Sequence, residues 1–363
     1  MVDTNKQLFF ALLRDALWRQ EECIPAGVSE EDTEKLFQDA TEQTVKALVI
    51  DALVRHEVKV PRPLVLRMIG LQNQVEQNNH QLNDRLKDFV MLMETNDVDY
   101  RVVKGQTVAA FYPNALLRQC GDIDYYCNAE NFEKSVQVLK NAWHVNPDQE
   151  DSDHHMEFYH RDVLFEGHYS LGLFHNKQKD EYWERILRED EEYQVNVGEV
   201  KVKTLSPTLH TLYIFLHLYH HLMELGIGLR QFCDWAVLLH ACHDEINQEQ
   251  LRYHLQQLGV ENAYRACGCV LTDYLGLPAK DFTYQLTEKD RRYTTKILNI
   301  VFYRGNMGKY NKKSTTMGWK HNIEATAIKW SHFYKFMPLA PDYSWRWISY
   351  EMKRKIASKM RRG

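Results

Sequence analysis

Two aspartates on one short apolar segment constrain this chain more than any other feature. Residues 100–127, YRVVKGQTVAAFYPNALLRQCGDIDYYC, predict a strand (100–103), a Lys-Gly turn, a helix of about two turns, a polar turn and a second strand. Because side chains on a strand alternate between its faces, Asp122 and Asp124 should share one face while Ile123 joins a core. Neighbouring carboxylates repel unless a cation lies between them, so the pair indicates a site for Mg²⁺ or Mn²⁺.

Positive charge precedes these carboxylates. Lys104 and Gly105 lie where the first strand turns into the helix, so free backbone N–H groups and the helix dipole can meet an anion that the lysine neutralises. Phosphate is the anion that this arrangement favours. Arg118 lies four residues before Asp122 and adds a second cation, unless it pairs with a carboxylate across the turn.

A later segment supplies another acid. Residues 154–171, HHMEFYHRDVLFEGHYSL, predict two strands joined by a tight turn at 160–162. Glu166 and His168 are two apart on the second strand and therefore share a face. We expect Glu166 to be the third carboxylate of the metal site. His168 is either a substrate or phosphate contact or a half-buried structural histidine.

Lys-Gly, then an Arg shortly before Gly-Asp-Ile-Asp, resembles the uncharacterised nucleotidyltransferase family of the DNA polymerase beta superfamily, whose arrangement is broadly similar to that of abortive-infection type toxins. The resemblance is specific from Arg101 to about Leu173 and looser over 40–245. It implies that two strand carboxylates hold the metals of a nucleoside triphosphate, and that a third arrives on a later strand, where the family carries an acid-x-His similar to Glu166-x-His168. Many superfamily members carry Gly-Ser where this chain has Gly105-Gln106.

The rest of the chain reads as helical around this centre. We expect an α+β fold: a small mixed nucleotidyltransferase sheet with helices, flanked by helical regions. The expected parts are an N-terminal helical region (1–95), the nucleotidyltransferase core (96–204), a C-terminal helical domain (205–300) and a basic aromatic tail (301–363). Apolar residues at helical spacing and a Ser-Pro start signal at 206–207 support the helical assignments.

The helix after Ser206-Pro207 is rich in histidine. His210, His217 and His221 lie on one stripe, but the chain has no His-Glu-x-x-His, so zinc is not expected there. The resemblance instead implies that some of these histidines line the cleft where the family's helical domain closes over its substrate. Arg230 either forms an i, i+4 ion pair with Asp234 or holds substrate.

Composition indicates the cellular compartment, the state of the cysteines and the partners of the C-terminal tail. No stretch approaches the roughly 18 apolar residues of a membrane span, and no secretory signal begins the chain, so we expect a cytoplasmic protein. The chain has 7 cysteines but no Cys-x-x-Cys, which favours reduced thiols over zinc or disulfides. The net charge of −5 hides a basic tail: residues 301–363 carry 14 Lys and Arg against 3 acids. Such a basic, aromatic tail suits RNA, an anionic membrane surface or docking on the acidic body.

The sequence thus predicts a metal-dependent enzyme that transfers NMP from an NTP such as ATP to a hydroxyl acceptor: a sugar, small molecule, protein or RNA. The expected metal ligands and catalytic residues are Asp122, Asp124 and Glu166. The residues expected to contact triphosphate or acceptor are Lys104, Gly105, Gln106, Arg118, His168, His217, His221 and Arg230. Two alternatives remain open: a nucleotide-binding or interaction module with lost or weak catalysis, which Gln106 favours, and a toxin-like RNA nucleotidyltransferase.

Overall fold

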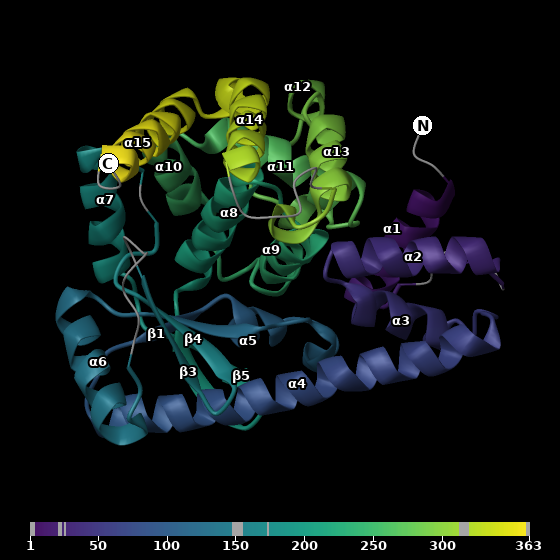
Figure 1. The fold of residues 1–363 in the computed structure, drawn as a ribbon, viewed down its shortest axis with the longest axis horizontal. Helices are drawn as coiled ribbons and strands as arrows, with labels where there is room; N and C mark the ends of the chain where they lie inside the picture. Colours follow the sequence, from purple (N-terminus) through teal and green to yellow (C-terminus); the bar gives the residue numbers. More distant parts are fainter. Residues whose placement is uncertain are drawn as a thin grey trace.

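The computed structural model describes residues 4–20, 24, 27–146, 155–172, 174–311 and 319–360 (Figure 1). The fold is α+β, as predicted: a four-stranded mixed sheet and a separate two-stranded hairpin lie among many helices. The strands are β1 (Arg101–Val103), β2 (Asp122–Tyr126), β3 (His155–His160), β4 (Val163–His168), β5 (Tyr193–Val197) and β6 (Val200–Thr204). No helix in the described part of the chain is both long and apolar enough to cross a bilayer.

The larger helices fall before, within and after the sheet. Those before it are α1 (Thr4–Trp18), α2 (Glu30–Glu42), α3 (Lys46–Arg55) and α4 (Arg62–Thr95). Those between the strands are α5 (Gly105–Ala109), α6 (Ala129–Trp143) and α7 (Lys177–Arg188). Those after it are α8 (Pro207–Glu224), α9 (Leu229–Ala241), α10 (Gln248–Leu258), α11 (Glu261–Asp273), α12 (Glu288–Arg291), α13 (Thr294–Arg304), α14 (Trp319–Phe336) and α15 (Pro341–Met360).

The sheet has the strand order β1-β2-β4-β3, and only the central pair is parallel. In that pair Asp124 lies opposite Glu166, and Ile123 opposite Phe165. The β3–β4 hairpin turns at Arg161 and Asp162, whose φ angles of 46° and 66° give the paired left-handed residues of a type I′ turn. The tight turn predicted at this point is therefore confirmed, and it fixes the register of Glu166.

The two faces of the sheet have different neighbours. Phe89 of α4 packs on Tyr125 and Phe165, with ring centroids 4.6 and 5.8 Å apart. In Figure 1 α4 runs beneath the sheet along its length, while α8 and later helices stand above it. Since side chains alternate along β2 and β4, the face opposite α4 carries Asp124 and Glu166. One face of the sheet thus packs against α4, and the opposite face carries the carboxylates.

Helices α1, α2 and α3 pack on one another and also contact the C-terminal helices. The side chain of Trp18 donates a hydrogen bond to the carbonyl of Leu275, and that of Gln43 donates to the carbonyl of Val301. Residues 82–93 of α4 pack with the sheet, whereas Leu64, Met68 and Val75 in its first half join the core that includes α1, α2 and α3. Helices α2 and α3 are separated at Thr44, which adopts a left-handed φ of 56°.

The C-terminal segment docks on the body. Phe336, Tyr343 and Trp347 are buried, and Lys329 of α14 pairs with Glu224 of α8 at 3.1 Å. Of the three alternatives for the basic aromatic tail, docking is the one that the structure shows for residues 319–350. Contacts with RNA or a membrane through its exposed face stay predictions.

The predicted start of the helix at Ser206-Pro207 is confirmed. The Ser206 side chain accepts from the Leu209 amide and caps α8. The helix after the Lys-Gly turn is shorter than the two turns expected, because α5 ends at Ala109. Six cysteines fall in the described ranges and are free thiols; Cys23 lies outside them.

Candidate active site

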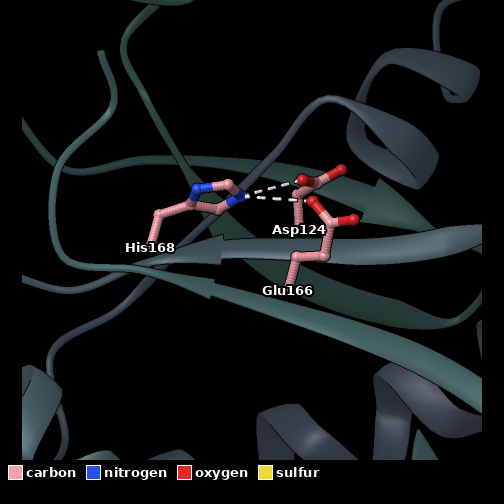
Figure 2. A group of neighbouring side chains, drawn as sticks. All are labelled: Asp124, Glu166 and His168. Atoms are coloured by element: carbon pink, nitrogen blue, oxygen red, sulfur yellow. Dashed lines mark hydrogen bonds and ion pairs between the residues drawn. The ribbon is translucent and has the colours of Figure 1, made fainter. Parts of the chain in front are cut away.

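The centre of the site is formed by neighbouring strands. Asp124 of β2 and Glu166 of β4 lie in register, and both carboxylates point toward the imidazole of His168 (Figure 2). His168 Nε2 is 2.9 Å from Asp124 Oδ1 and 3.8 Å from Glu166 Oε2. One donor atom from each residue lies within 4.8 Å of the others, which is the spacing of ligands around one metal ion. The shared faces predicted for these residues are confirmed.

Asp122 lies two residues before Asp124, on the same face of β2. It lines the same cavity, and burial together with the Asp124 carboxylate raises its pKa. The tight donor cluster contains His168 where the sequence predicted Asp122. The structure therefore brings all three predicted carboxylates to one face and adds an imidazole to the pair at its centre.

Negative charge at this face is in excess. Burial and the Asp124 carboxylate raise the pKa of Glu166. Burial opposes ionisation of Asp124 too, but Lys104 and His168 hold its pKa below the ordinary value. Lys104 Nζ is 2.7 Å from Asp124 Oδ1 and acts as the local cation. Converging buried carboxylates with one imidazole are donors that suit a divalent metal, so the residues fit the Mg²⁺ or Mn²⁺ expected from the sequence.

Lys104 adopts a backbone conformation that favours glycine. Its φ of 58° and ψ of −148° lie in a region where a side chain costs about 1–3 kcal/mol. Gly105 also has a positive φ, of 44°, so the chain turns sharply between β1 and α5. The strain places the ammonium group directly over β2. Because glycine would adopt this conformation at lower cost, we infer that the lysine side chain, which contacts Asp124, accounts for lysine at this position.

Arg118 is bound by Asp234 of α9. Its Nε and Nη2 donate to the two carboxylate oxygens of Asp234 at 3.0 and 2.7 Å, and both residues are buried. Arg230 donates to the Gln119 carbonyl at 2.9 Å. The pair that the sequence left open between Arg230 and Asp234 is therefore replaced by one between Asp234 and Arg118. Both arginines line the cavity, so a contact with substrate stays open to each.

The Gln106 side chain points toward α4 and away from the cavity. Its side-chain amide is buried and donates to Asn83 Oδ1 of α4 at 2.7 Å. Gly105 lines the cavity, whereas the Gln106 side chain binds the helix beneath the sheet. This geometry leaves the predicted triphosphate contact of Gln106 to its backbone.

Helix α8 forms the wall opposite the strands. Tyr213, His217 and His221 line the cavity; His217 Nε2 is 3.4 Å from Lys104 Nζ and 3.1 Å from His221 Nε2. Burial lowers the pKa of His217 and lowers that of His221 to about 3, so both are neutral near pH 7. His210, predicted on the same stripe, is buried away from the cavity lining. Tyr213 was missed, although its position one turn before His217 could have revealed it.

The cavity between strands and helices has a volume of about 980 Å³. Its lining includes residues of β3 and of the C-terminal segment that the sequence did not indicate. These are His155, Glu157, Met307, Lys309, Tyr343, Trp347 and Tyr350. Sequence spacing cannot reveal them, because they are brought to the site by folding over long separations.

Three solved structures are similar to part of this chain. The solution structure of the antibiotic-resistance factor ANT(2'')-Ia is 11% identical, with a TM-score of 0.37 over 54% of this chain and 97% of that one. The lincosamide antibiotic adenylyltransferase LnuA, solved with lincomycin bound, is 18% identical, with a TM-score of 0.30 over 43% and 94%. An antigenic nucleotidyltransferase-like protein from Paracoccidioides brasiliensis is 13% identical, with a TM-score of 0.33 over 58% and 98%.

No curated protein matches the chain. A family model described as "Uncharacterised nucleotidyltransferase" matches residues 29–276, which is more than half of the chain and includes β1 to β6, α8 and α9. The resemblance inferred from the Lys-Gly and Gly-Asp-Ile-Asp motifs is thereby confirmed: the chain belongs to the uncharacterised nucleotidyltransferase family.

Proposed function

We propose that this protein transfers a nucleotidyl group from an NTP to a hydroxyl acceptor, with release of pyrophosphate, and that the reaction requires Mg²⁺ or Mn²⁺. One observation carries the proposal. The donor atoms of Asp124, Glu166 and His168 converge within 4.8 Å on the cavity face of the sheet. Asp122 from the same face adds a third carboxylate.

The metal ligands would be Asp122, Asp124 and Glu166. His168, hydrogen-bonded to Asp124 Oδ1, would keep that carboxylate oriented. A bound divalent ion would neutralise charge on the triphosphate and on the departing pyrophosphate. The carboxylates gathered at this face support the assignment: among the described residues Lys104 is the cation in direct contact with Asp124, and His168 binds the same oxygen.

Lys104 and Arg118 would contact the phosphate oxygens. Lys104 Nζ is 2.7 Å from Asp124 Oδ1, and Arg118 lines the same cavity as Asp122. A triphosphate held between the two cations is fixed in position and its charge is stabilised, and this is most of what phosphoryl transfer needs from an enzyme. Glu166 would orient the acceptor hydroxyl or take its proton. The acceptor itself, whether sugar, small molecule, protein or RNA, is left open.

The experiment is a pyrophosphate-release assay with each NTP in the presence of Mg²⁺, supplied in turn with a small-molecule extract and with total RNA. Wild type is compared with Asp124→Asn and with the matched control Asp88→Asn. Asp88 is on α4, beneath the sheet, where it pairs with Arg85. We expect release by wild type and Asp88→Asn, none by Asp124→Asn, and none when EDTA is added.

Three results would each lead to a different conclusion. Equal release by wild type and Asp124→Asn would remove the metal assignment. Tight NTP binding with no release in any extract would favour the alternative of a nucleotide-binding module with lost catalysis. Release only with RNA would identify the toxin-like alternative.

A further inference from the structure

Two residues on adjacent turns of α9 bind the segment that precedes β2, residues 112–119. Arg230 donates to the carbonyl of Gln119, and Asp234 accepts from Arg118 and from Tyr112. The partners on the core side flank the 3-10 turn before β2, more than 100 residues away in sequence. This part of α9 is therefore built around the segment that carries Arg118.

The Arg118–Asp234 contact has fixed geometry. Nε binds Oδ1 at 3.0 Å and Nη2 binds Oδ2 at 2.7 Å, while the Tyr112 hydroxyl donates to Oδ1 at 2.8 Å. Arg118 and Asp234 are 4% and 3% exposed, so the pair is shielded from water. Two parallel bonds to a planar guanidinium set its orientation as well as its position. One edge of Arg118 is occupied by Asp234, and Nη1 on the other edge makes a longer contact, 3.4 Å, with the Gln119 carbonyl. Arg118 also lines the cavity.

We propose that Asp234 is a positioning residue: it orients the Arg118 guanidinium for the triphosphate and does not itself contact the nucleotide. The proposal rests on the proposed function, since it assigns Arg118 to the phosphates. It also makes the helical region after β6 a direct determinant of nucleotide affinity. A displacement of α9 would release Arg118 and weaken nucleotide binding, with the metal ligands on β2 and β4 left in place.

The test is isothermal titration calorimetry with the NTP that wild type binds best in the presence of Mg²⁺, alongside Mn²⁺ binding measured by electron paramagnetic resonance without nucleotide. The variant is Asp234→Asn. Asp290→Asn is the matched control, because Arg265 binds Asp290 through the same two nitrogens at 3.1 and 2.9 Å, in α11 and α12. Circular dichroism establishes that each variant is folded.

We expect Asp234→Asn to weaken NTP binding roughly ten- to a hundred-fold, the loss typical of one charge-assisted contact. Mn²⁺ binding should not change, and Asp290→Asn should bind the NTP like wild type. In an Arg118→Gln background, Asp234→Asn should cost nothing further, because it acts through the arginine. A purely structural role would not produce this non-additivity.

Several outcomes would overturn the proposal: unchanged NTP binding by folded Asp234→Asn, an equal loss in Asp290→Asn, a parallel loss of Mn²⁺ binding, or additive effects in the double variant. If Asp234→Asn does not fold, Tyr112→Phe replaces it, and an NTP affinity equal to wild type would then count against the proposal. Failure of wild type to bind any NTP would instead contradict the proposed function.

Discussion

Gly167 lies between Glu166 and His168 and gives the sharpest test of how packing positions the site. A Cβ added there would lie 2.5 Å from the Tyr125 hydroxyl oxygen and 2.7 Å from its Cζ. Tyr125 is fully buried and packs against Phe89 of α4, so the ring has little room to withdraw. Gly167→Ala must therefore push β4 away from β2, or displace Tyr125 into the core.

Overpacking of this kind typically costs 1–3 kcal/mol, and the two short contacts place Gly167→Ala in the upper part of that range, about 2–3 kcal/mol. Removing the hydroxyl in Gly167→Ala/Tyr125→Phe should recover about half of it, since the 2.5 Å contact disappears and the 2.7 Å contact remains. Urea unfolding measures both. Mn²⁺ binding should weaken in the single variant, because its ligands Asp124 and Glu166 lie on the separated strands.

Gly70→Ala is the control of opposite sign. Gly70 is exposed inside α4, where an added Cβ meets nothing within 4 Å, so alanine should stabilise the helix by about 1 kcal/mol. A Gly167→Ala variant within about 0.5 kcal/mol of wild type, the range of an ordinary surface change, would refute the idea that glycine sets the spacing of β2 and β4.

Three further predictions concern stability. Burial lowers the pKa of His210 to about 4, so between pH 6.5 and 4 the unfolded chain binds more protons than the folded one and stability falls as pH falls. This residue should cost about 2 kcal/mol at pH 5 relative to pH 8; His210→Leu should remove that part of the pH dependence in urea melts, whereas exposed His80→Gln should leave it unchanged. Lys104→Gly should be about 1 kcal/mol more stable than Lys104→Ala in the same assay, because relief of backbone strain exceeds the entropy cost of glycine; the reverse order would contradict the strained geometry. Trp347→Ala should cost about 3–5 kcal/mol in thermal or urea unfolding and exposed Trp345→Ala less than about 0.5, and equal small losses would show that α15 is not docked.

The sequence predicted the carboxylate face well because strand periodicity is local. Once β2 and β4 were assigned, alternation put Asp122 with Asp124, and Glu166 with His168. Their meeting depends on parallel pairing of β2 with β4, which periodicity does not establish; the family resemblance implied only that a third carboxylate arrives on a later strand. The α+β class followed from the same reading.

What the sequence missed depends on contacts across long separations. The i, i+4 spacing suggested Arg230 with Asp234, yet the stronger partner is Arg118, which offers two nitrogens in the plane of the carboxylate. Gln106 looked like part of a phosphate turn, but the side chain finds Asn83 in α4. The cavity wall made by α15 could not be predicted, because docking of a basic aromatic tail is decided by burial rather than by local pattern.

The most direct test of metal-dependent nucleotidyl transfer needs no knowledge of the acceptor. Calorimetric titration of an NTP into wild type, with Mg²⁺ and then with EDTA, compares binding in the two conditions, and Asp124→Asn is measured beside it. Asp124, Glu166 and His168 converge on one spot, and Asp122 lies on the same face of β2. This geometry predicts binding by wild type that is lost on removal of Mg²⁺ and in the Asp124→Asn variant. Equal NTP affinity with and without Mg²⁺, or in the variant, would contradict the role assigned to these carboxylates.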